Sequence, residues 1–206
     1  MANTDTLEYE VSSRGLGYNK PQEMGRKLWA PMFVMAIMAW VVGMALAISR
    51  ASIVSDFGAA DAGALRLSHL IPAFQFIGFL AVFSAVSFAT ARILGAFRKG
   101  GGEVQETAGT QVQTLKMPKT AKLFMASMAM GMMIILAMVV LHFVAAGNVG
   151  TWSAETLARW GDVLEGFRRL GVALYLFGIT FGLGTIITVL RFQAGRVRQL
   201  PAEAHA

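Results

Sequence analysis

The sequence contains no cysteine in its 206 residues. This absence excludes disulfide bonds, thiolate metal ligands and cysteine nucleophiles. Charged side chains are also scarce: they make up 15% of the chain, against roughly 25% in a typical soluble domain, whereas 55% of the residues are hydrophobic. The missing charge is concentrated in four long windows, and the remaining charge lies between them, which is typical of membrane spans.

Four windows contain no Asp, Glu, Lys or Arg, and they cover residues 31–49, 70–91, 123–146 and 170–190. Each window is close to the about 20 apolar residues that an α-helix needs to cross the hydrocarbon layer. A spanning helix also satisfies its own backbone hydrogen bonds, which the interior of a bilayer cannot do. The sequence therefore predicts an all-α integral membrane protein whose domain, residues 31–190, is a four-transmembrane-helix bundle.

The 18 Lys and Arg residues are shared unevenly among the segments outside the windows. Thirteen lie in the N-terminal tail 1–30, the connection 92–122 and the C-terminal tail 191–206, and five lie elsewhere. The thirteen are Arg14, Lys20, Arg26, Lys27, Arg92, Arg98, Lys99, Lys116, Lys119, Lys122, Arg191, Arg196 and Arg198, and the five are Arg50, Arg66, Arg159, Arg168 and Arg169. By the positive-inside rule we expect a multi-pass protein of the inner (cytoplasmic) membrane, with both tails and the connection 92–122 cytoplasmic.

The net charge of +6 does not point to nucleic acid as a partner. The basic residues lie at the ends of the spans and do not form the basic face of a soluble domain. The partners that the pattern predicts are the lipid bilayer and, because several helix faces carry small residues, other membrane subunits.

A weak internal repeat relates the second and fourth windows at an offset of 93 residues. At this offset Gly78 matches Gly171, Phe88 matches Phe181, and Arg98 matches Arg191, which lies just outside the fourth window. The two halves enter the membrane from the same side, so they would be parallel repeats of one helical hairpin. We therefore expect the bundle to consist of two such hairpins.

Small residues recur at four-residue spacing within all four windows. Such stripes let helix backbones approach closely in lipid, where the hydrophobic effect does not draw helices together. We expect these residues to be helix-packing positions: Ala39, Gly43, Ala47, Ala81, Ala85, Ala89, Ser127, Gly131, Gly178 and Gly182.

The two longer connections have different compositions. Residues 153–169 place Leu157 and Leu164 on one helical face, offer Glu155–Arg159 and Glu165–Arg169 as ion pairs, and begin with Ser153 as an N-cap. This pattern predicts a short amphipathic helix at the outer interface, separate from the fourth span. The connection 92–122 contains the glycine run 100–102, which indicates a flexible cytoplasmic linker.

His69 and His142 are the candidate cofactor-binding residues. His69 lies directly before the second window, at the start of that span, and His142 lies one turn before the end of the third, so the antiparallel spans bring both to the same outer depth. Two imidazoles there could ligate a b-type haem, bind the head group of a quinone, or hold a metal ion with Asp56 or Asp61. The alternative is that both are interfacial residues without a ligand. The third histidine, His205, lies in the C-terminal tail.

The windows offer little other chemistry, and no catalytic residue or complete metal motif is predicted. Ion and proton pathways need ionisable side chains at mid-membrane depth, and the windows lack them. Pro72 is expected in the first turn of its helix, where proline is tolerated. We therefore expect a non-catalytic accessory or anchoring subunit of a multisubunit membrane complex, such as a respiratory or other redox assembly, with no cofactor. The alternatives are a subunit that binds haem b or quinone through His69 and His142, and a small transporter or channel.

Overall fold

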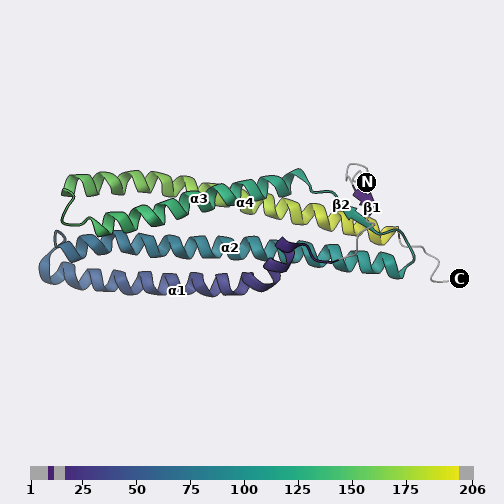
Figure 1. Ribbon diagram of the computed structural model, residues 1–206, viewed down its shortest axis with the longest axis horizontal. Coiled ribbons are helices and arrows are strands. Elements are labelled where there is room, and N and C mark those ends of the chain that lie inside the picture. Colours follow the sequence, from purple (N-terminus) through teal and green to yellow (C-terminus); the bar gives the residue numbers. More distant parts are fainter. Residues whose placement is uncertain (1–8, 12–16, 200–206) are drawn as a thin grey trace. The chain divides into compact units, whose positions relative to one another are not determined.

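The computed structural model describes residues 9–11 and 17–199, so Arg14 and His205 lie outside the described residues. Figure 1 traces the elements, which are β1 (Tyr9–Val11), α1 (Lys20–Phe57), α2 (Ala62–Thr107), β2 (Gln113–Leu115), α3 (Lys119–Gly147) and α4 (Ala154–Arg198). All four helices are long and apolar enough to cross a membrane. The predicted helical class with four candidate spans is confirmed, and the arrangement is consistent with a four-helix bundle.

The helices are longer than the apolar windows. At 1.5 Å per residue, α2 with 46 residues and α4 with 45 are each about 68 Å long, roughly twice the thickness of the hydrocarbon layer. The prediction of a flexible linker at the glycine run was wrong, because α2 continues through residues 100–102 to Thr107. The prediction of a separate interfacial helix was also wrong, since residues 154–169 and the fourth window form one uninterrupted helix.

Local signals explain where the helices begin. Asn19 and Gln22 form a reciprocal capping box at α1, with Asn19 Oδ1 accepting from the Gln22 N–H at 3.0 Å. Asp61 Oδ1 accepts from the Gly63 N–H at 2.7 Å at the start of α2. The predicted N-cap of α4 is confirmed, because Ser153 Oγ accepts from the backbone N–H of Thr156 at 3.2 Å.

Glycine allows the turns that follow two of the helices. Gly58 directly follows α1 with a φ of 88°, and Gly109 follows α2 with a φ of 67°. Both values lie in the left-handed region, which other residues adopt only at a steric cost. These two positions are therefore turn residues rather than packing residues.

The two short strands were not predicted. β1 and β2 pair antiparallel, with Glu10 opposite Thr114 in the register. A three-residue strand is too short to show the alternation of apolar and polar residues by which strands are recognised. The pairing joins the segment before α1 to the connection between α2 and α3.

The chain packs as two compact units, and each long helix contributes to both. Within the described residues, unit 1 takes 9–11, 17–29, 86–126 and 178–199, and unit 2 takes 30–85 and 127–177. In unit 2 the Trp40 indole packs against Gly78. The Tyr175 ring packs against Gly131, where an added Cβ would lie 3.2 Å from the ring.

Unit 1 uses similar contacts. A Cβ on Gly182 would lie 3.1 Å from the Phe124 ring, and the hydroxyl of Thr185 donates to that of Thr120 at 3.1 Å. Most residues of the expected small-residue stripes are buried, with three exceptions. The buried ones are Ala39, Gly43, Ala81, Ala85, Gly131, Gly178 and Gly182; Ala89 and Ser127 are half-buried; and Ala47 is exposed.

Candidate functional site

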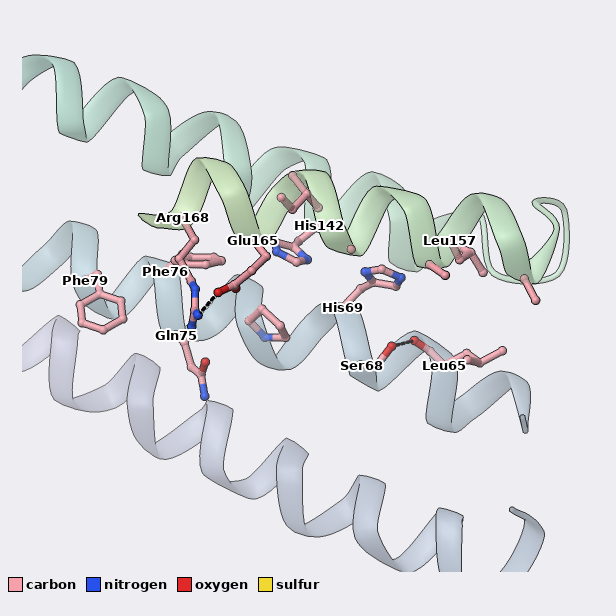
Figure 2. A pocket seen from close by; sticks show the side chains of 15 residues that line it. Leu65, Ser68, His69, Gln75, Phe76, Phe79, His142, Leu157, Glu165 and Arg168 are labelled. Atoms are coloured by element: carbon pink, nitrogen blue, oxygen red, sulfur yellow. Dashed lines mark hydrogen bonds and ion pairs between the residues drawn. The ribbon is translucent and has the colours of Figure 1, made fainter. Parts of the chain in front are cut away.

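The candidate site is a pocket of about 390 Å³ in unit 2, formed by α2, α3 and α4 (Figure 2). Its walls are mostly apolar, and a few polar side chains reach it from all three helices. The lining residues include Leu65, Ser68, His69, Pro72, Gln75, Phe76, Phe79, His142, Leu157, Leu164, Glu165 and Arg168. An apolar pocket with a few convergent polar groups is the usual form of a small-molecule site.

The structure brings the two candidate histidines together. His69 lies in the third turn of α2 and His142 near the end of α3, and the centroids of their rings are 5.8 Å apart with an interplanar angle of 45°. Figure 2 shows the two imidazoles next to one another above the α2 ribbon. Both are buried, with 7% and 6% of their surface exposed. Their proximity follows from the antiparallel course of α2 and α3.

His142 is held by stacking and lacks a hydrogen bond at one nitrogen. Its ring stacks on Phe76 with centroids 5.5 Å apart and an angle of 30°. Its Nδ1 is buried and has no hydrogen-bond partner in the part of the chain that the structure describes. Buried polar atoms are nearly always paired in native proteins. The imidazole is therefore positioned but one of its polar groups is unsatisfied.

α4 supplies the charged side of the pocket. Arg168 donates to the carboxylate of Glu165, and Arg169 Nε donates to the same oxygen at 3.2 Å. These bonds, with the one from Arg168 the stronger cause, lower the pKa of Glu165, which precedes the fourth apolar window. The predicted Glu165–Arg169 pair is confirmed, whereas the Glu155–Arg159 pair, both members of which are described, does not form.

Proline explains part of the pocket's backbone. Pro72 was expected in the first turn of its helix, but α2 begins at Ala62 and Pro72 lies in its interior, where it lines the pocket. Because proline has no N–H, the carbonyl of Ser68 loses its usual partner within the helix. This carbonyl acceptor beside His69 was not predicted. The apolar window begins at residue 70, whereas the helix itself begins at Ala62.

The alternative of a metal ion held with Asp56 or Asp61 finds no support. Over residues 17–199, no group of three or more His, Asp or Glu side chains could hold a metal ion. Asp61 instead caps α2, and Asp56 is exposed near the end of α1. The pocket offers two imidazoles, an aromatic wall and an ion pair, which suit a planar organic ligand with hydrogen-bonding groups better than a bare ion.

No protein-family model, no curated protein and no solved structure matches this chain.

Proposed function

We propose that this protein binds the head group of a quinone between α2, α3 and α4 and acts as a subunit of a membrane redox assembly. The observation that supports this most strongly is the unsatisfied Nδ1 of His142 beside His69 in a mostly apolar pocket. A buried polar atom without a partner is costly, and a ligand that completes its hydrogen bonds recovers that cost. A quinone carbonyl accepts a hydrogen bond from an imidazole N–H, and a quinol hydroxyl donates one to an imidazole nitrogen.

The shape and lining of the pocket agree with such a ligand. Its volume of about 390 Å³ lies within the range of roughly 300–1,000 Å³ that small-molecule sites occupy. Phe76 and Phe79 provide flat apolar surfaces for a ring, and Leu65 and Leu157 add aliphatic contacts. The polar groups lie on two sides, with the histidines on α2 and α3 and the Glu165–Arg168 pair on α4.

A b-type haem is the second candidate ligand, and the 5.8 Å separation of the two rings is what favours it. Two histidines on facing helices can supply both axial ligands of a haem iron. A haem would have to insert its macrocycle between the rings, whereas a quinone needs only the existing cavity. A reduced-minus-oxidised visible spectrum of the purified protein separates the two ligands, because a bis-histidine haem has strong bands in that spectrum.

The quinone proposal is tested by titrating the purified protein in detergent with a short-chain ubiquinone and a short-chain menaquinone. We expect micromolar binding to at least one of them and a loss of tenfold or more in affinity for His142→Leu. His142→Gln, which keeps a hydrogen-bonding side chain, should lose less. Met133→Leu is the matched control, because Met133 lies on the same helix with 64% of its surface exposed and outside the pocket.

Two outcomes contradict the proposal. One is a wild-type protein that binds neither quinone, and the other is a His142→Leu variant that binds as tightly as the wild type. A haem spectrum that disappears in His142→Leu would replace the quinone with the second ligand.

We also propose that the chain works within a larger assembly, as the sequence indicates. In support, only 17% of the apolar window of α1 is buried within the chain. Met38, Met44 and Ile48 are each at least 60% exposed, and they would face either lipid or a neighbouring subunit. Recovery of stoichiometric membrane partners after purification in mild detergent would support this assembly, and recovery of the chain alone would contradict it.

The finer topology is likewise a proposal. The positive-inside pattern supports an inner-membrane protein with both termini in the cytoplasm. The offset of 93 residues supports an origin by duplication of one hairpin, in which Gly78 and Gly171 occupy equivalent positions. Both glycines allow close contacts, the first with Trp40 and the second with Ile135.

A further inference from the structure

A second cavity of about 580 Å³ lies in unit 1. It is lined by the start of α1, the second half of α2, the segment from β2 into α3, and the last turns of α4. Most of its surface is apolar, with Phe88, Leu94, Phe124 and Val189 among the lining residues. Two arginines, Arg98 and Arg196, also line it, and none of its lining residues is acidic.

Arg196 is a buried charge without a counter-ion among residues 17–199. Only 3% of the surface of Arg196 is exposed, and its Nη2 is buried without a hydrogen-bond partner. Nε donates to Gln105 Oε1 at 2.8 Å and Nη1 donates to Gln193 Oε1 at 3.2 Å, so both of its hydrogen-bond partners are neutral amides. Its Cζ also lies 5.2 Å from the centroid of the Phe192 ring, which is uncharged. No ion pair joins Arg196 to any carboxylate within residues 17–199. A buried guanidinium without a counter-ion is energetically costly, and a bound anion would reduce that cost.

The surrounding residues hold this arginine in place before any ligand arrives. Gln105 is itself buried, and its Oε1 also accepts from the backbone N–H of Gln113 at 3.0 Å. Gln193 is fixed by donating to the carbonyl of Phe97 at 2.8 Å. Gly101 has no Cβ, and one would collide with Gln193 and Arg196. Gly101 thus leaves room for the guanidinium of Arg196.

Arg98 adds a second positive charge to the same cavity. It is half-buried on α2, and within the described chain it forms neither an ion pair nor a hydrogen bond. Two guanidinium groups over one cavity match the geometry of phosphate oxygens better than that of a single carboxylate. The apolar remainder of the wall suits an acyl chain.

We propose that this cavity binds a phosphate group through Arg196 and Arg98, and that the group is the head of an anionic phospholipid whose acyl chain lies along the apolar wall. Basic pockets between membrane helices on the cytoplasmic side take such head groups. The alternative source of the same chemistry is free inorganic phosphate. The apolar lining favours the lipid, because an acyl chain would pack against Phe88, Phe124 and Val189, whereas free phosphate would leave these side chains without an apolar contact.

The experiment uses the full chain in neutral detergent, freed of native lipid, with added phosphatidylglycerol, phosphatidylcholine or inorganic phosphate. Thermal unfolding and native mass spectrometry report binding, since a ligand of the folded state raises the unfolding temperature. We expect phosphatidylglycerol to bind at least tenfold more tightly than phosphatidylcholine and to raise the unfolding temperature by several degrees. Arg196→Gln should abolish this preference.

Arg191→Gln is the matched control, because Arg191 carries the same charge on the same helix but is exposed and outside the cavity. Arg98→Gln provides a second loss variant if Arg196→Gln fails to fold. An equal response to inorganic phosphate, lost in both loss variants, would keep the phosphate site and replace the lipid by free phosphate. The proposal is overturned if phosphatidylglycerol has no effect, or if its effect in a folded Arg196→Gln or, failing that, in Arg98→Gln is the same as in the wild type and Arg191→Gln.

Discussion

The ring of Tyr175 on α4 stacks on Phe83 of α2, with centroids 3.8 Å apart and an interplanar angle of 11°. Tyr175 is fully buried, and its hydroxyl has no hydrogen-bond partner within the described residues. The ring is therefore well packed, while its one polar atom is buried without compensation. The two parts of this side chain should have opposite effects on stability.

Replacing Tyr175 by Phe removes the uncompensated hydroxyl and keeps the stacked ring. We expect stability to stay unchanged or rise by up to about 1 kcal/mol, because no hydrogen bond is lost. Tyr175→Ala should cost roughly 3–5 kcal/mol, the range for truncating a buried aromatic ring. Unfolding by a denaturing detergent in mixed micelles measures both changes. A Tyr175→Phe variant clearly less stable than the wild type would mean that the hydroxyl has a partner.

Gly78 is the clearest close-packing position in unit 2, because a Cβ there would collide with the Trp40 indole. We expect Gly78→Ala to destabilise the protein by about 1–3 kcal/mol, the usual cost of overpacking. Gly166→Ala is the matched control, since Gly166 lies within α4 with no heavy atom near its would-be Cβ. The control should gain about 0.5–1 kcal/mol from helix propensity. Equal effects of the two substitutions would contradict the packing role of Gly78.

The sequence predicts the number and approximate place of the spans because absence of charge over some twenty residues is a strong signal. It also predicts that His69 and His142 lie at one depth, since that needs only the direction of each helix. Which side chains face each other depends on helix rotation, and a nearly uniform apolar composition contains little information about rotation. For that reason Trp40 opposite Gly78, and Phe83 opposite Tyr175, were not foreseen.

The helix ends beyond the apolar windows were the weakest part of the sequence interpretation. Glycine has a low helix propensity, so the run 100–102 was taken for a linker. In the structure, α2 stays helical through this run, and Gln193 and Arg196 of α4 occupy the space that a side chain at Gly101 would need. The cavity around Arg196 could not be predicted either, because its walls come from four segments far apart in the sequence.

The absence of cysteine makes the proposed topology directly testable. Thr151 lies exposed in the turn between α3 and α4, and Thr107 is exposed at the end of α2. With Thr151→Cys we expect labelling of intact cells by a membrane-impermeant maleimide, and with Thr107→Cys labelling only after the cells are opened. The unmodified chain, which has no thiol, gives the background. The reverse pattern would invert the orientation, and labelling of both sites in intact cells would contradict a cytoplasmic connection.

Gln105 links three elements of unit 1 through one oxygen. Its Oε1 accepts from Arg196 Nε of α4 at 2.8 Å and from the backbone N–H of Gln113 in β2 at 3.0 Å. Gln105→Ala would leave both donors buried or half-buried without this acceptor, so we expect a loss of about 2–3 kcal/mol, toward the upper end of the cost of such groups. Gln111→Ala is the control, because Gln111 is exposed between α2 and β2 and should change stability by less than about 0.5 kcal/mol. Both values come from the same detergent unfolding assay. If the two substitutions cost the same, Gln105 does not organise the end of unit 1, and the position of Arg196 depends on its contacts with Gln193 and the Phe192 ring.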